Sequence, residues 1–129
     1  MFIQIQIPPN FENFVKSELL VQQSNIQKIK PFSEAEILQR LQSLPDWEIK
    51  HNQLTYTHQF QNFVEAINFI NCLVTPVETA NHHPDLVISY NQVTINLITH
   101  DVEGLTAQDF DIATTISQLI QTWKSDENC

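Results

Sequence analysis

The sequence predicts an α+β fold: a four-stranded antiparallel sheet with three helices on one face, in the order α-β-β-α-β-β-α, plus an N-terminal extension. Two pairs of strand-like segments are each joined by a short polar turn, which favours antiparallel pairing. Helical segments with one apolar face precede, separate and follow these pairs. The 129 residues, 42% of them hydrophobic, suffice for one domain with its own core.

Residues 1–30 are expected to be the extension and residues 31–129 the folded domain. In the extension, three isoleucines alternate with glutamines as they would in a strand, and Pro8 with Pro9 ends that pattern. A short helix could follow at residues 10–22.

The first helix and hairpin of the domain have clear signals. Ser33, with Glu36 three residues later, has the pattern of a capping box, so a helix is predicted from about Glu34 to Leu44. Strands at 47–50 and 54–60 should then form a hairpin. Its turn contains no glycine, so the turn type stays open.

The longest helix is predicted at residues 63–80, because its apolar positions recur every three or four residues. Pro76 lies late in this segment. A proline inside a helix removes one backbone donor and clashes one turn back, at a cost of roughly 3 kcal/mol. We therefore expect a kink or a break at Pro76.

A second hairpin is predicted from residues 85–90 and 92–99, followed by a final helix at 106–123. Alternation along the second strand of this hairpin directs Val93, Ile95 and Leu97 towards the helices, which leaves His100 at the end of the opposite, more open face. Gly104, the only glycine, is expected to mark a special turn before the last helix.

Composition excludes several functional classes. Six Lys and Arg residues against 15 Asp and Glu residues give a net charge of −9, which disfavours direct binding of nucleic acids or anionic membrane surfaces. No apolar run reaches the length that spans a bilayer. Cys72 and Cys129 have no spacing typical of a disulfide framework or a metal site, which fits a reducing compartment, and we expect a cytoplasmic protein.

Three of the five histidines lie between Glu78 and Asp101, at His82, His83 and His100. Zinc binding is disfavoured because adjacent histidines at a helix exit cannot easily chelate one ion, and no cysteine helps. Nucleophilic catalysis is disfavoured because no nucleophile elbow is present. General acid-base catalysis in a cleft suits imidazoles, whose ordinary pKa of about 6.5 lies near neutral pH.

Structural explanations compete for the same residues. The paired histidines could cap the negative end of a helix. Asp109, three residues after Thr106, could close a capping box or serve the site. Glu78 lies four residues before His82, where it could hold that imidazole or simply face solvent.

The spacing of these residues resembles the signature of the pterin-4a-carbinolamine dehydratase family. The words NHHPD, YNQV, THD and GLT agree with it, and the likeness extends from about Ser33 to Trp123, leaving residues 1–30 outside. The residues that stand at the family's spacing are Glu78, His82, His83, Pro84, Tyr90, His100 and Asp109.

This resemblance implies dehydration of 4a-hydroxytetrahydropterin to quinonoid dihydropterin, in the recycling of tetrahydrobiopterin, without a metal or organic cofactor. It implies His82 and His83 as acids, His100 as a pterin-binding group or base, and Glu78 with Asp109 as residues that orient the imidazoles. The positions that match the family's pterin pocket are Asn81, Ile98, Thr99 and Asp101. Homodimers or homotetramers assembled through sheet edges and helices are also implied.

A second function class stays open. Relatives with this fold can act as binding modules, either as a dimerisation cofactor of a transcription factor or as assembly chaperones that lack the histidines. Here the histidines are present, which favours an enzyme over a non-catalytic module acting through protein partners. Pro76 could displace Glu78, and the extension could occlude the site or add an interface.

Overall fold

The sheet has four antiparallel strands in the order β1-β2-β4-β3, in a computed structural model that describes residues 29–124 and residue 129. The strands are β1 (Glu48–Lys50), β2 (Gln53–Gln59), β3 (Asp85–Ser89) and β4 (Gln92–Leu97). Each hairpin contributes one edge strand and one central strand, and β2 pairs with β4 at the centre. The strand and helix predicted in the extension lie outside the described residues.

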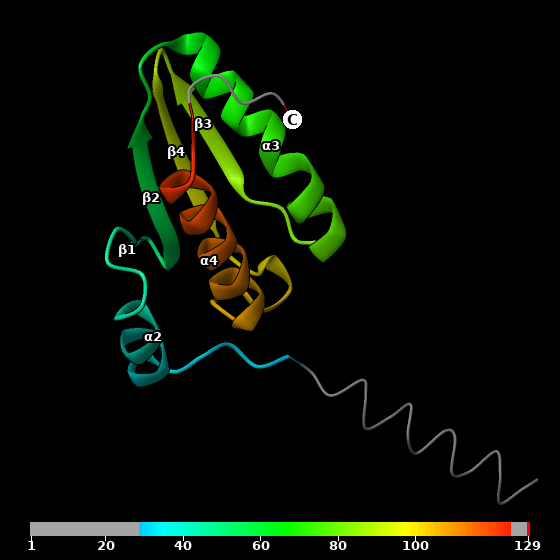
Figure 1. Cartoon of the computed structure of the whole chain (residues 1–129). Coiled ribbons are helices and arrows are strands. Elements are labelled where there is room, and N and C mark those ends of the chain that lie inside the picture. The colour runs from blue at the N-terminus through cyan, green and yellow to red at the C-terminus, as the bar shows by residue number, and fades with distance from the viewer. Residues whose placement is uncertain (1–28, 125–128) are drawn as a thin grey trace, which may run out of the picture.

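Two long helices cover one face of this sheet, and a short helix lies at one end (Figure 1). The helical elements are α2 (Glu34–Leu41), α3 (Phe63–Ala80), the 3-10 helix η1 (His100–Val102) and α4 (Ala107–Gln121). The predicted α+β class, the antiparallel sheet and the order of elements are therefore confirmed, with α2 at one end of the sheet and not beside α3 and α4. The 3-10 helix η1 is an addition that the strand pattern did not indicate.

Alternation along β4 directs its side chains to two different faces. Val93, Ile95 and Leu97 are fully buried under the helices, as predicted. On the opposite face, Asn96 accepts a hydrogen bond from the Thr55 hydroxyl of β2 at 2.8 Å. The sheet therefore has one apolar face towards α3 and α4 and one polar face.

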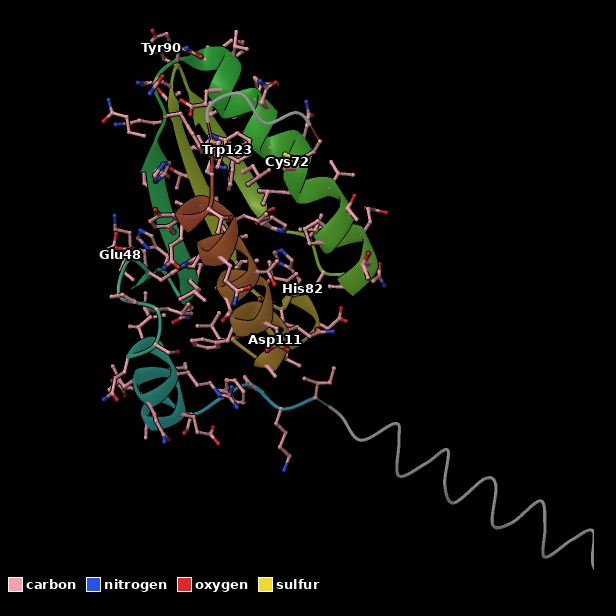
Figure 2. All side chains as sticks on the ribbon, viewed as in Figure 1. Glu48, Cys72, His82, Tyr90, Asp111 and Trp123 are labelled. Atoms are coloured by element: carbon pink, nitrogen blue, oxygen red, sulfur yellow. A yellow bond between two sulfur atoms is a disulfide. The ribbon has the colours of Figure 1, made fainter. Side chains whose placement is uncertain are left out.

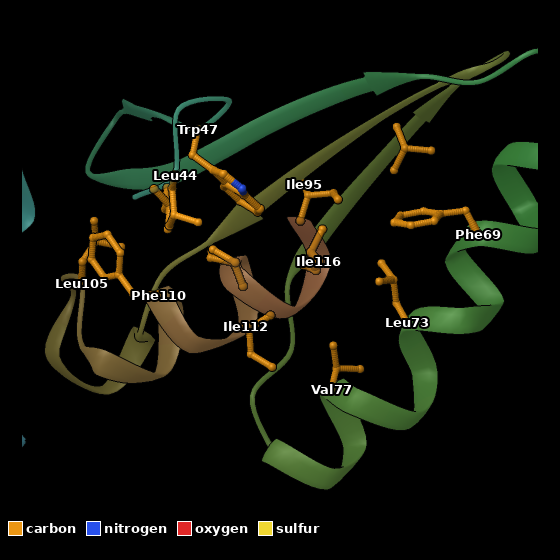
Figure 3. Packing of buried hydrophobic residues seen from close by; sticks show 14 of the residues in the cluster. Leu44, Trp47, Phe69, Leu73, Val77, Ile95, Leu105, Phe110, Ile112 and Ile116 are labelled. Atoms are coloured by element: carbon orange, nitrogen blue, oxygen red, sulfur yellow. The ribbon is translucent and has the colours of Figure 1, made fainter. Parts of the chain in front are cut away.

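The core lies between α3, α4 and β4 (Figure 3). Phe69, Leu73 and Val77 follow one another at four-residue steps along α3, so they line the same side of that helix. They face Ile112 and Ile116 of α4 across the core. Burying each such side chain contributes roughly 1.5–3 kcal/mol to folding. This packing holds the end of α3 beside the start of α4, which is where the histidines emerge.

The first helix is shorter than predicted. Its capping box is present, with the Ser33 N–H donating to Glu36 Oε2 at 2.7 Å. The helix ends at Leu41, however, and not at Leu44. Leu44 is only 3% exposed, and its amide bonds the Leu41 carbonyl in a tight turn. Leaving the helix lets Leu44 reach the core.

The expected break at Pro76 does not occur, because α3 continues through Pro76 to Ala80. Leu73 and Val77, on either side of the proline, are both buried in the core. We infer that their burial offsets the local cost of the missing backbone donor. Glu78 is therefore delivered by a continuous helix.

The sequence left the type of the first hairpin turn open and singled out Gly104 for the turn before the last helix. His51 and Asn52 both have positive φ values, 49° and 61°, which identifies the first hairpin turn as type I′. Gly104 does not have a positive φ. The residue with a positive φ in this turn is Glu103, at 49°. Glycine is needed at position 104 for a different reason, because an added Cβ would lie 2.7 Å from the Pro31 Cβ atom.

Cys72 and Cys129 form a disulfide, although their spacing is not typical of a disulfide framework. They are 57 residues apart, a separation that belongs to no recognisable spacing rule. The inference of a reducing compartment from these cysteines is therefore not supported. None of the helices within 29–124 is long and apolar enough to cross a membrane.

Candidate active site

His82 is positioned by the way α3 ends. Asn81 adopts the left-handed conformation, with φ 48° and ψ 40°, and asparagine tolerates this conformation better than most residues do. Its amide bonds the Glu78 carbonyl, and the His82 amide bonds the Val77 carbonyl at 3.2 Å. These two bonds form a Schellman-type cap that turns the chain inward. Figure 2 shows His82 between the end of α3 and the first turns of α4.

Asp109 holds the His82 ring. Its side chain is fully buried, and its Oδ1 atom lies 2.6 Å from His82 Nε2, while the His82 side chain is 10% exposed. The Oδ2 atom accepts the Thr106 amide at 2.9 Å and the Thr99 hydroxyl at 2.7 Å. The Thr106 hydroxyl lies 2.8 Å from Thr99 Oγ1, and it donates there because the Thr99 proton is already engaged. Asp109 therefore both caps α4 and orients the imidazole.

Glu78 pairs with His83, and not with His82, the imidazole that the four-residue spacing would have allowed it to hold. The distance from Glu78 Oε1 to His83 Nε2 is 2.5 Å. Of the two possibilities for Glu78, the pair with His82 does not form, because the helix ends at Ala80 and the left-handed Asn81 redirects His82 away from the face of Glu78. This pair is largely exposed, with side-chain exposures of 51% for His83 and 67% for Glu78.

His100 begins η1 and does not continue the strand, so its direction is not set by strand alternation. The loop that carries it is closed by Thr99 and Gly104, whose backbones bond each other in both directions. His100 Nε2 lies 3.8 Å from Asp85 Oδ2, and both side chains are mostly exposed. The third imidazole thus also has a carboxylate beside it.

One cavity of about 350 Å³ brings the three histidines together. Its volume lies within the range of small-molecule sites. All four predicted pterin-pocket residues belong to its wall, while Glu78 and Asp109 do not line it but contact His83 and His82. The lining consists of Ile29, Asn81, His82, His83, Ile98, Thr99, His100, Asp101 and Gln108.

Three residues of the site were missed by the sequence reasoning. Gln108 lines the cavity from the first turn of α4, one position before Asp109, and that adjacency was a usable signal. Asp85 follows the HHP segment directly and could have been grouped with the histidines. Ile29 had no signal, since it lies at the edge of the extension, far from the histidines in sequence.

Tyr90 is part of the family spacing but lies outside the site. It has a φ of 55° in the turn between β3 and β4, and its side chain is 69% exposed. Figure 2 shows it at the tip of that hairpin, beside the start of α3, whereas His82 lies at the other end of α3.

The chemistry of the site follows from the histidine-carboxylate pairs. Because the carboxylates engage Nε2 of His82 and His83, Nδ1 is the nitrogen of each ring that can exchange a proton with a bound molecule. Among the described residues, no group of three or more His, Cys, Asp or Glu side chains is arranged to hold a metal ion. The arrangement can therefore deliver and remove protons from more than one direction within one cavity.

Comparisons with known proteins agree with this arrangement. Residues 30–119 match the sequence profile of the family described as pterin 4 alpha carbinolamine dehydratase. A protein from Cyanothece sp. named "Putative pterin-4-alpha-carbinolamine dehydratase" is 50% identical over 91 residues, which cover 70% of this chain and 94% of that protein. A protein of the same name from Trichodesmium erythraeum is 55% identical over 84 residues, covering 65% and 90% of the two chains.

A solved structure is also similar. The crystal structure of a transcriptional coactivator/pterin dehydratase from Brucella melitensis has a TM-score of 0.67 and 26% sequence identity, covering 70% of this chain and 98% of that one. Residues 30–119 contain the whole sheet, α3, all but the last two residues of α4, and the three clustered histidines. The chain belongs to the pterin 4 alpha carbinolamine dehydratase family.

Proposed function

We propose that the protein is a hydro-lyase that dehydrates 4a-hydroxytetrahydropterin to quinonoid dihydropterin and water. The 4a-hydroxyl group receives a proton and leaves as water when the C4a–O bond breaks. The N5–H proton is removed as the C4a–N5 double bond forms. One group must therefore give a proton and another must accept one, and no net oxidation occurs.

His82 and His83 are the acids in this proposal, and His100 binds the pterin or accepts the N5 proton. The observation that carries the proposal is the grouping of three imidazoles, each beside a carboxylate, around one cavity. A carboxylate at Nε2 fixes the ring so that Nδ1 presents the mobile proton. Each well-placed acid or base contributes on the order of 10² to 10⁴ in rate.

The cellular role and assembly belong to the same proposal. We place the reaction in tetrahydrobiopterin recycling in the cytoplasm, with the pterin as small-molecule substrate and a homodimer or homotetramer as the working form. The exposed edge strand β3, which presents Leu86, Val87 and Ile88, supports assembly through sheet edges. Sedimentation of Val87→Lys against the unaltered protein tests this, because a charge on a pairing edge should shift an oligomer towards monomer.

The activity is tested with chemically generated 4a-hydroxytetrahydropterin, whose dehydration is followed by absorbance above the spontaneous rate. The variant that combines His82→Ala with His83→Ala should lose the protein-dependent rate and keep its circular dichroism spectrum. His51→Asn is the matched control, because it removes an exposed imidazole outside the cavity, and asparagine suits the positive φ there. Full turnover in the double variant would reject the histidine assignment.

A non-catalytic binding module predicts a different pattern. The unaltered protein would then show no turnover above the spontaneous rate, and the double variant would retain its protein partners in affinity capture. The turnover assay thus separates the two classes of function directly.

A further inference from the structure

The cavity around the histidines is bordered by carboxylates and lacks permanent cations among the described residues. We propose that it selects a pterin whose ring substituents are uncharged and discriminates against one that bears a carboxylate or phosphate. This inference rests on the proposed dehydratase function and concerns the substrate class of that same site.

The described cations all lie elsewhere. Arg40 stacks over the Phe32 ring at 4.3 Å, and Lys50 pairs with Glu48 at 2.9 Å. Lys124 follows α4 at its far end. Lys30 is next to the lining residue Ile29, but it is exposed and is not part of the cavity wall. Within the described part of the chain, a bound anion would therefore find no Lys or Arg side chain in the wall.

The histidines at the cavity do not supply enough positive charge to make up for the missing Lys and Arg side chains. Four carboxylates belong to the site or pair with its imidazoles, and only three histidines accompany them. If all three imidazoles were protonated, the site would still carry one net negative charge. The carboxylates are Glu78, Asp85, Asp101 and Asp109.

The remaining wall suits an uncharged substituent. Ile29 and Ile98 provide apolar surface, and the amide groups of Asn81 and Gln108 can donate and accept hydrogen bonds. A hydroxylated side chain on the pterin ring could therefore be bound without a counter-ion, whereas a carboxylate would be repelled and also lose hydration.

The size of the effect follows from Coulomb's law. Single charges several ångströms apart in a solvent-exposed cavity interact weakly, so we expect roughly a three- to tenfold difference in kcat/KM between matched substrates. Because salt screens such interactions, the difference should shrink as ionic strength rises.

The test compares two 4a-hydroxytetrahydropterins that carry a hydroxymethyl group or a carboxylate at C6. The unaltered protein should prefer the hydroxymethyl substrate. Gln108→Arg should narrow this preference, and Gln108→Glu should widen it, because both changes place a charge at the cavity. Gln121→Arg is the matched control: it adds the same charge at the other end of α4, about 20 Å away, and should leave the ratio unchanged.

Equal kcat/KM values that do not respond to salt or to either Gln108 variant would overturn the charge selection. If neither substrate were turned over, the dehydratase function itself would fail. Selection between uncharged and charged pterins would then be tested by fluorescence titration, which measures the binding of stable oxidised pterins that carry the same two groups. Tighter binding of the hydroxymethyl pterin supports it, and equal or weaker binding refutes it.

Discussion

Asp109 is a buried carboxylate whose two oxygens serve different neighbours. Oδ2 accepts the Thr106 amide and the Thr99 hydroxyl, while Oδ1 faces His82. A charge in a fully buried position is tolerated only when its hydrogen bonds are satisfied, and here donors surround it. The carboxylate therefore couples the start of α4 to the orientation of the His82 ring.

Replacing Asp109 with asparagine should reduce turnover while preserving the fold. An amide keeps the shape of the side chain but offers one acceptor oxygen, so either His82 or the Thr99–Thr106 pair must face an NH₂ group. We expect a loss of kcat on the order of 10 to 10²-fold. Asp111→Asn, an exposed change on the same helix, is the control, and equal activity of the two variants would contradict the positioning role.

His58 should make stability fall at acidic pH. Burial beside Phe60 lowers the pKa of His58, and this outweighs the nearby carboxylates of Glu65 and Asp46, which raise it. The unfolded chain therefore binds this proton first, below about pH 6.5. Stability from the neutral ring is complete above pH 6.5 and is lost as pH falls towards the lowered pKa.

Urea unfolding of the unaltered protein and of His58→Gln between pH 5 and pH 7.5 isolates this contribution. The difference in the free energy of unfolding between the two should decrease as the pH falls. A difference that is independent of pH would show that the neutral ring is not favoured by the fold.

The sequence alone identified the three histidines as candidate site residues, but it did not show which carboxylate pairs with each of them. The sequence placed Asp109 equally well as a cap and as a site residue, because a carboxylate three residues after Thr106 fits both. In the structure, the same carboxylate caps α4 and contacts His82. The pairing of Glu78 with His83 could not be read from helical spacing, since it depends on the left-handed Asn81.

At the scale of elements, the segment before α2 packs against the loop that carries His100. The Phe32 amide bonds the Leu105 carbonyl at 2.7 Å, and Pro31 lies against Gly104. Ile29, at the start of this segment, lines the cavity. Loop and segment thus support each other on one side of the site.

Gly104→Ala should destabilise this contact. The new Cβ would lie 2.7 Å from the Pro31 Cβ atom, so the segment or the loop must shift, at a cost of about 1–3 kcal/mol. Glu103→Gly is the opposite control, because glycine accommodates the positive φ of that residue and should be neutral or slightly stabilising. Equal unfolding midpoints for Gly104→Ala and the unaltered protein would argue against the close packing.

Elements were predicted well where periodicity and capping agreed. Residues 63–80 form the predicted helix with the predicted bounds, because its apolar stripe is long and Asn62 caps its start. Sequence rules based on neighbouring residues failed where packing in the core determined the bounds of an element. Pro76 does not interrupt α3, and α2 ends early because Leu44 is buried. No local signal foretold η1.

At the scale of the whole molecule, the Cys72–Cys129 disulfide ties the last residue to the middle of α3. Closing a loop of this length restricts the unfolded chain, which stabilises the fold by on the order of 4 kcal/mol in the loop-entropy account. Such a long-range pairing could not be read from the sequence, because two cysteines without a spacing rule indicate no partner.

Reduction should therefore lower the stability of the unaltered protein. Its urea midpoint with dithiothreitol should fall to that of Cys129→Ser, and the variant itself should not respond to the reductant. A midpoint that is the same in both conditions would show that the disulfide adds no stability.

The most direct test of the site is nuclear magnetic resonance of the five imidazole side chains during titration with 7,8-dihydropterin. The resonances of His82, His83 and His100 should shift together with one dissociation constant, while those of His51 and His58 stay in place. Shifts confined to one of the three rings, or shared equally by all five, would contradict a single pterin cavity enclosed by these three histidines.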